Sequence, residues 1–158
     1  MSTVISGNIP ETPSPRFQVV LAWLESLTKK DFNAVGSVMS ESYTHKLMPR
    51  SIGIDDRLLT KEQTLAVIQF IFGSLDSENH SITGIIHERL EVDDTVLVHL
   101  TSDGTSLTGN PYRGDFIFWF EVKEEKDGKL RLVSGKEFLD SKGATGYLET
   151  EKLAFPLL

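Results

Sequence analysis

The chain has 158 residues, of which 39% are hydrophobic and 25% are charged, as is usual for a soluble globular protein. A chain of this length folds as one domain and buries roughly 70% of the surface that its unfolded form exposes, enough for a core and one internal pocket. The net charge of −7 argues against binding to nucleic acid, and no apolar run reaches the roughly 18 residues of a membrane-spanning helix. Cysteine is absent, which excludes disulfides, thiolate metal sites and a cysteine nucleophile.

The first 13 residues are polar and contain prolines, and they predict a flexible leader before a single domain at residues 14–158. The leader lacks the basic and then apolar pattern of a signal peptide. Together with the absence of cysteine, this predicts a cytoplasmic protein.

Three helices are predicted in the first half of the chain. Ser14 offers an N-cap and a proline follows it at the first helical position, which together favour a helix start. Apolar residues then recur every three or four positions over residues 17–27. A short second helix follows. Thr60 and Gln63 then form a capping-box pattern that opens the third helix.

After residue 80 the pattern changes to strands. The long strands are predicted to pair as two hairpins, residues 82–92 with 95–101 and residues 112–123 with 130–139. Helices followed by an antiparallel meander predict an α+β fold, in which three N-terminal helices pack on one face of a curved antiparallel sheet. Such a sheet leaves a cavity where the helices do not fill it.

The register of the last hairpin decides which ionisable residue faces the cavity. With a two-residue turn at Asp127-Gly128, Phe118 lies opposite Glu137, on a face that is otherwise apolar. A carboxylate in such surroundings has a raised pKa, as a general acid or base near neutral pH requires. With a three-residue turn and a bulged Gly128, the faces exchange and Lys136 joins the phenylalanines. Both registers are compatible with the sequence.

His45, Tyr43 and Glu137 are the catalytic candidates. His45 and Tyr43 follow the second helix, in the segment expected at the pocket mouth. Histidine titrates near neutrality, so His45 is suited to move a proton while Tyr43 polarises a carbonyl or hydroxyl and Glu137 acts as a second proton carrier. The alternatives are structural: His45 bonded to a loop carbonyl beside Pro49, and Glu137 paired with a basic neighbour such as Arg131.

Six further residues are predicted to line the pocket: Trp23, Met48, Phe116, Phe118, Phe120 and Asp140. Two of them have a structural alternative. Trp23 lies on the first predicted helix and is also suited to the core, and Asp140 is also suited to cap the segment that follows it.

His87 and His99 are expected on neighbouring strands. Two histidines and a carboxylate are able to ligate a metal, but the alternation groups both histidines with Arg89, Glu91 and Thr101 on a polar face. Such a face suits solvent or a dimer contact, so no metal site and no cofactor are predicted.

Three segments carry a family pattern: Tyr43–Gly53 followed by Lys61-Glu62, Thr108–Tyr112, and Lys136–Ser141. In order and spacing they resemble the SnoaL-like (polyketide cyclase-like) family of the nuclear transport factor two-like superfamily, in its fungal branch. The resemblance covers roughly residues 17–141 and implies a cone-shaped α+β barrel with a pocket between the helices and the concave sheet. Relatives include ketosteroid isomerases, polyketide cyclases, scytalone dehydratases, epoxide hydrolases and members with no known catalysis, so the fold does not define the reaction.

The chain departs from two branches of this superfamily. Its first predicted helix has no tyrosine, whereas ketosteroid isomerases use one there as an oxyanion donor, and the Asp-Arg-Asp arrangement of limonene epoxide hydrolases has no match. The resemblance also implies a homodimer. Ile117, Trp119 and Phe138 share the face opposite the phenylalanines, where they are expected to form the contact between two sheets.

Three functions are consistent with these features. The first is a cofactor-independent enzyme that isomerises, cyclises or dehydrates a small hydrophobic metabolite by acid–base catalysis. The second is a non-catalytic module of the same fold that binds a small hydrophobic ligand or dimerises. The third is a dimeric domain whose pocket is filled by Phe70, Phe72 and Met48.

Overall fold

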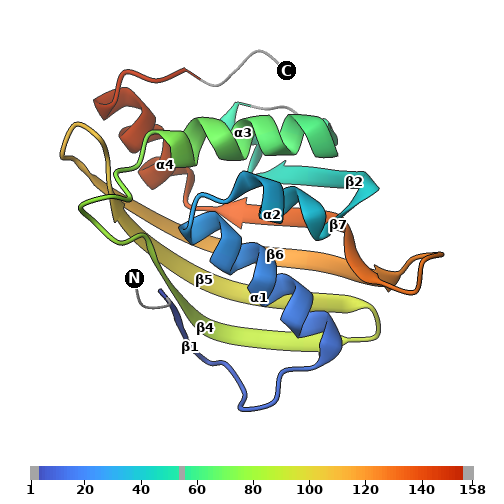
Figure 1. Cartoon of the computed structure of the whole chain (residues 1–158). Coiled ribbons are helices and arrows are strands. Elements are labelled where there is room, and N and C mark those ends of the chain that lie inside the picture. The colour runs from blue at the N-terminus through green and yellow to red at the C-terminus, as the bar shows by residue number, and fades with distance from the viewer. Residues whose placement is uncertain (1–3, 54–55, 155–158) are drawn as a thin grey trace.

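The computed structural model describes residues 4–53 and 56–154. Within them, four α-helices pack against one face of a seven-stranded sheet (Figure 1). The predicted α+β fold, with helices laid over a curved sheet, is therefore confirmed. None of the described helices is long and apolar enough to cross a membrane.

The helices are α1 (Pro15–Thr28), α2 (Phe32–Ser37), α3 (Lys61–Gly73) and α4 (Ser141–Thr150), with a 3-10 turn, η1, at Arg50–Ile52. The strands are β1 (Ile5–Gly7), β2 (Met39–Met48), β3 (Leu59–Thr60), β4 (Thr83–Val92), β5 (Thr95–Thr105), β6 (Pro111–Glu124) and β7 (Leu130–Leu139). Their order across the sheet is β1-β4-β5-β6-β7-β2-β3. β1 falls within the predicted leader.

Side-chain caps define where the first three helices begin. The Ser14 hydroxyl accepts a hydrogen bond from the third amide of α1, and the Asp31 carboxylate accepts one at the same position of α2. At α3, Thr60 and Gln63 form the reciprocal capping box that the sequence predicts. Each cap satisfies an amide that helix geometry leaves unpaired, which explains why these starts can be recognised locally.

The sheet is mixed and open, which corrects the expected antiparallel barrel. β2 runs parallel to β7 and β1 runs parallel to β4, whereas the other neighbouring strands are antiparallel. A parallel pair needs a long connection, and β2 has one because α3 and the whole meander separate it from β7. The sheet ends at β1 on one side and at β3 on the other, and these edge strands do not pair with each other.

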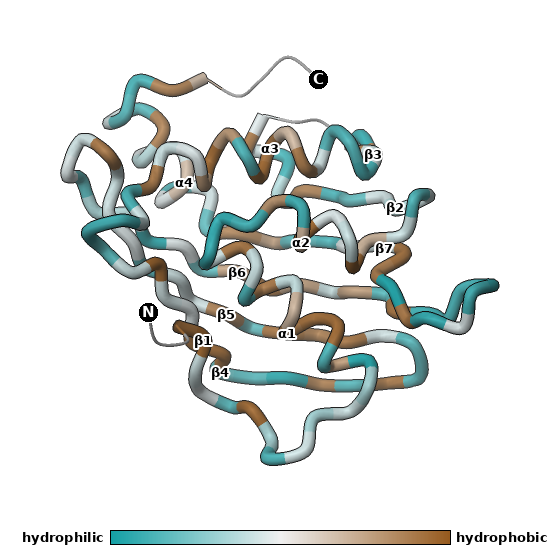
Figure 2. The backbone as a smooth tube through the Cα atoms, in the orientation of Figure 1, coloured by the Kyte–Doolittle hydropathy of each residue, from teal (hydrophilic) through white to brown (hydrophobic). Residues whose placement is uncertain are grey.

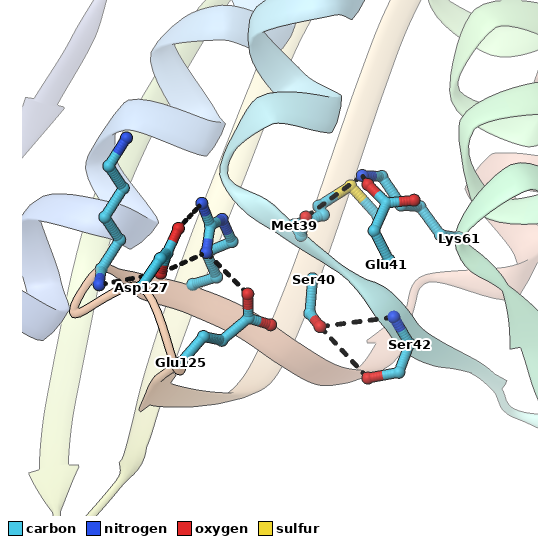
Figure 3. A network of polar contacts seen from close by, with 9 residues as sticks. Met39, Ser40, Glu41, Ser42, Lys61, Glu125 and Asp127 are labelled. Carbon is cyan, nitrogen blue, oxygen red and sulfur yellow. Dashed lines mark hydrogen bonds and ion pairs between the residues drawn. The ribbon is translucent and has the colours of Figure 1, made fainter.

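The tip of the β6–β7 hairpin is a three-residue turn. The Gly128 amide donates to the Glu125 carbonyl, and the Glu125 amide donates to the Lys129 carbonyl, both at 2.9 Å. Gly128 has a φ of +79°, which glycine adopts at no steric cost. Arg131 closes the tip by donating to Glu125 and to both carboxylate oxygens of Asp127 (Figure 3).

A bulge in β7 restores the other predicted register at the level of the cavity. The β6–β7 ladder shifts by one residue between Glu121 and Val122, which leaves Val133 of β7 without a cross-strand partner. Beyond the bulge, Phe118 lies opposite Glu137, as the sequence predicts for a two-residue turn. The extra residue in the turn and the extra residue in the strand cancel, so Glu137, and not Lys136, stays on the face that the helices cover.

Apolar side chains form three clusters over this face. The largest lies between α1 and the long strands, and the smaller ones lie at η1 and at α4. Apolar and polar residues alternate along the strands, as a sheet with one covered face requires (Figure 2). Phe116 is only partly buried but packs against all three clusters. It therefore marks the place where the clusters meet around an unfilled space.

Candidate functional site

A cavity of about 130 Å³ lies between the helices and the covered face of the sheet. Its walls come from α1, α3 and α4 and from the inner residues of β2, β5, β6 and β7. Aliphatic and aromatic side chains make up most of these walls. The ionisable residues among them are His45 of β2, Glu137 of β7, Asp140 at the start of α4, Tyr147 of α4, and Tyr112, Arg113 and Asp115 of β6.

Tyr43, His45 and Glu137 form one hydrogen-bonded chain at this cavity. The Tyr43 hydroxyl lies 2.7 Å from Nδ1 of His45, and Nε2 of His45 lies 3.0 Å from Oε2 of Glu137. Tyr43 and His45 alternate on β2, and Glu137 reaches them from the adjacent parallel strand β7. The side chains of His45 and Glu137 are 4% and 14% exposed. The structure thus brings together the three residues that the sequence singles out, although His45 and Glu137 are 92 positions apart.

Gly135 makes room for this chain. It lies opposite His45 on β7, where a Cβ atom would come within 2.2 Å of the Tyr43 hydroxyl and 2.8 Å of Nδ1 of His45. Neither distance is compatible with a side chain. The tyrosine and histidine rings therefore stack over the bare backbone of β7, with centroids 5.9 Å apart.

The two hydrogen bonds constrain the imidazole proton. A phenol that donates to Nδ1 leaves the proton of neutral His45 on Nε2, from which it is donated to the Glu137 carboxylate. When Glu137 is protonated, the direction reverses: Glu137 donates to Nε2, and Nδ1–H donates to Tyr43. Burial and, to a lesser degree, the Glu137 carboxylate raise the pKa of Tyr43 well above its usual value, so Tyr43 remains a neutral phenol.

Four of the six residues predicted to line the pocket are in the cavity wall: Trp23, Phe116, Phe118 and Asp140. Trp23 is also part of the core, since its ring packs edge-on against Phe118 and Phe120. Asp140 also occupies the N-cap position of α4, but its side chain makes no capping hydrogen bond.

Phe120 and Met48 lie outside the cavity wall. Phe120 is fully buried and packs against Trp23, with ring centroids 5.1 Å apart, so it belongs to the solid part of the core. Met48 belongs to β2, a strand in which Leu47 turns into the cavity and the next residue therefore turns to the opposite face. The sequence predicts no strand in this segment, so the prediction for Met48 does not use strand alternation.

Tyr112 is in the cavity wall and is not among the residues that the sequence singles out. The signal for it is present in the alternation of β6. Tyr112 has the same parity as Phe116 and Phe118, so it lies on the same face of the strand.

His87 and His99 lie away from the cavity, and their rings are 5.0 Å apart. A shift in the β4–β5 register places Glu88, and not His87, opposite His99. Nε2 of His87 lies 2.7 Å from Oγ1 of Thr101, and Nε2 of His99 lies 2.8 Å from Oδ1 of Asp115. Across residues 4–53 and 56–154, no three side chains of the kinds that ligate metals come together.

Helices on a curved sheet around a cavity define a fold of the ketosteroid isomerase-like type, and comparison with known proteins identifies the family. The model of the SnoaL-like domain matches residues 20–133, and the chain belongs to this family. None of the curated protein sequences compared with the chain matches it.

Solved structures show the same fold. AusH from Aspergillus nidulans aligns with a TM-score of 0.67 and 23% identity over 84% of this chain and 88% of AusH. BvnE pinacolase from Penicillium brevicompactum aligns with a TM-score of 0.60 and 21% identity over 88% and 97%. A Catenulispora acidiphila protein with a ketosteroid isomerase-like fold aligns with a TM-score of 0.62 and 15% identity over 87% and 94%.

Proposed function

We propose that the protein is a cofactor-independent enzyme that isomerises, cyclises or dehydrates a small hydrophobic metabolite by acid–base catalysis. The observation that carries the proposal is the Tyr43–His45–Glu137 chain, which ends in a largely apolar cavity. For a substrate that contains a carbonyl group, isomerisation, aldol cyclisation and dehydration can each proceed through one elementary step, the transfer of a proton to or from a carbon beside that group. A single buried carboxylate with a proton-exchanging partner is suited to that step.

In this mechanism Glu137 is the proton carrier. Its carboxylate accepts the proton from the substrate carbon, while His45 donates Nε2–H to it before the transfer and accepts from it afterwards. Tyr43 stays neutral and keeps His45 in place through Nδ1. His45 therefore tunes and orients the carboxylate, and Tyr43 acts through His45 and not on the substrate.

The cavity walls support a hydrophobic substrate. Trp23, Phe116 and Phe118 line the cavity together with Leu and Ile side chains of α1 and α3. Removing such surface from water favours binding by about 25 cal/mol per Å². Membership of the SnoaL-like family is compatible with an enzyme that acts on a small metabolite, but it leaves the substrate undefined.

The proposal is tested without knowledge of the natural substrate. 1-Tetralone, a bicyclic ketone, exchanges the hydrogens beside its carbonyl slowly in D₂O, and the exchange is followed by proton NMR. The wild-type protein is expected to accelerate it, and Glu137→Gln is expected to abolish the acceleration. Lys136→Gln is the matched control because Lys136 is exposed on the opposite face of β7. Equal rates for Glu137→Gln and wild type, with both proteins folded by circular dichroism, would contradict the proposal.

A non-catalytic binding module is the second candidate, favoured by the same apolar cavity. The discriminating observation is native mass spectrometry of freshly purified protein. A tightly retained small molecule in a protein that does not accelerate ketone exchange would support the binding module over the enzyme.

We also propose that two copies pair through the outer face of the sheet. Cross-strand neighbours build two apolar rows there, Leu90–Leu97–Trp119 and Ile117–Phe138, and Leu90 and Phe138 are 57% and 46% exposed. Exposed apolar side chains in one area mark an interface. Sedimentation equilibrium is expected to give a dimer for the wild type and a monomer for Trp119→Glu. A wild-type monomer would contradict the pairing.

A further inference from the structure

Tyr112 presents a buried phenol to the cavity. It lies on the covered face of β6, is 7% exposed and forms part of the cavity wall. Its ring packs edge-on against Tyr147, with centroids 5.1 Å apart. Its hydroxyl makes no hydrogen bond with any residue in the described ranges. The ring is therefore explained by packing, but the hydroxyl is not.

The other two tyrosines of the chain show the usual arrangement. All three are buried, but the Tyr43 hydroxyl is bonded to Nδ1 of His45, and the Tyr147 hydroxyl lies 2.6 Å from Oγ of Ser74. The fold does not use the Tyr112 hydroxyl, because this hydroxyl bonds to no described protein group, so phenylalanine would serve the fold equally well at position 112. An unpaired donor that faces a cavity points to a ligand as its partner.

The surroundings keep this phenol protonated. Burial first, and then the nearby Glu137 carboxylate and Tyr147, raise the pKa of Tyr112 above its usual value. Tyr112 and Glu137 line the same cavity, so one ligand can meet both. Tyr43, by contrast, is outside the cavity wall and already committed to His45, so it is not available to polarise a substrate carbonyl.

We propose that Tyr112 is the hydrogen-bond donor of the site and that the ligand is an apolar, enolisable carbonyl compound. This rests on the proposed function. Glu137 takes the proton from the carbon beside the carbonyl, and the C–H electron pair becomes the new C=C bond. The carbonyl π electrons move to the oxygen, where the Tyr112 O–H stabilises the enolate. Protonated Glu137 then returns the proton to another carbon or to a leaving oxygen, which regenerates the carboxylate.

The binding test compares two probes of nearly equal shape. 1-Tetralone carries a carbonyl oxygen, and tetralin lacks it. Their affinities for wild type and Tyr112→Phe are measured by the quenching of tryptophan fluorescence, since Trp23 is in the cavity wall. The wild type is expected to prefer the ketone, and Tyr112→Phe is expected to lose about threefold to tenfold of the ketone affinity with no loss for tetralin. The infrared carbonyl band of bound tetralone is expected to shift to higher frequency in the variant.

Other outcomes overturn the proposal. They are the absence of ketone binding or of ketone preference in the wild type, an equal loss for both probes, and an unshifted carbonyl band. The rate of ketone exchange shows whether the role of Tyr112 or the proposed function is contradicted. If Tyr112→Phe retains ketone exchange and binds the ketone as tightly as wild type, only the proposed role of Tyr112 is contradicted. If the wild type binds the ketone through Tyr112 but does not accelerate its exchange, the proposed catalysis is contradicted and the cavity is a carbonyl-binding site.

A stability comparison distinguishes a binding role from a structural one. Tyr112→Phe is expected to leave the melting temperature unchanged or to raise it, because it removes an unpaired hydroxyl. Tyr147→Phe is expected to lower it, because it breaks the contact with Ser74. A lower melting temperature for Tyr112→Phe would show that the phenol serves the fold, and would overturn the proposal.

Discussion

Two histidine–carboxylate pairs lie in different parts of the same sheet. His45 and Glu137 meet at 3.0 Å beside the cavity, and His99 and Asp115 meet at 2.8 Å away from it. Their lengths are similar, but their surroundings are not. The side chains of the first pair are 4% and 14% exposed, and those of the second are 32% and 59% exposed.

Because the two pairs have similar lengths, hydrogen-bond length does not identify a functional pair. Water and salt screen the exposed pair, whose contribution to stability is expected to lie below about 1 kcal/mol. In the buried pair each group depends on the other, because removal of one leaves its partner without a hydrogen bond in an apolar surrounding. Proton transfer is therefore expected only from the buried pair.

The largest difference between the two pairs is expected when the histidine of each pair is removed. His45→Ala leaves Glu137 and the Tyr43 hydroxyl unpaired, so we expect a loss of about 3 kcal/mol in the free energy of unfolding and at least a tenfold loss of ketone exchange. His99→Ala is expected to cost less than about 1 kcal/mol and to leave exchange unchanged. Urea denaturation and deuterium exchange measure the two quantities. Equal effects of both substitutions would break the comparison.

The next largest effect is expected when a side chain is added at Gly135. Gly135→Ala places a methyl group against the Tyr43 hydroxyl, and we expect a loss of about 2 kcal/mol in the free energy of unfolding. Tyr43→Phe in the same background is expected to recover part of the loss, since the closest atom is removed. Gly146→Ala is the control, because a side chain there meets nothing within 4 Å and alanine favours the helix α4. A Gly135→Ala protein as stable as wild type would contradict the packing described.

A smaller effect is expected from salt, which changes the coupling energy of the two pairs differently. Double-mutant cycles give the coupling energy of each pair at low salt and at about 1 M NaCl, where the screening length is about 3 Å. The His99–Asp115 coupling is expected to vanish at high salt, and the His45–Glu137 coupling is expected to persist. Loss of both couplings would indicate that water reaches Glu137 freely.

The smallest effect concerns an exposed pair with ideal geometry. The side-chain hydrogen bond from Arg131 lowers the pKa of Asp127 to about 2. A carboxyl group with a lowered pKa in the folded state contributes stability above its unfolded pKa, and this contribution disappears as the pH falls through the folded value. NMR titration is expected to show the Asp127 carboxyl titrating near this value in wild type and at a higher pH in Arg131→Gln, part of the way to the usual value of about 3.9, because the hydrogen bond from the Lys129 amide remains. An unchanged midpoint would show that the Lys129 amide, and not Arg131, holds the carboxylate.

Local signals in the sequence account for much of the site. The alternation of Phe116 and Phe118 predicts the covered face of β6, and the choice of His45, Tyr43 and Glu137 follows from their chemistry. Met48 shows the limit of local signals. The segment that contains it becomes an inner strand because it pairs with β7 on one side and β3 on the other, and no pattern within the segment indicates a parallel partner.

The helix starts, the α+β order and the residue types available for proton transfer can be predicted from the sequence, because caps and alternation act within a few residues. Which of these groups meet depends on tertiary contacts. The bulge at Val133 put Glu137 on the covered face in spite of a three-residue turn, and the parallel pairing of β2 with β7 brought His45 to it. Both outcomes depend on packing between segments that are far apart in the chain, and this packing has no local signature.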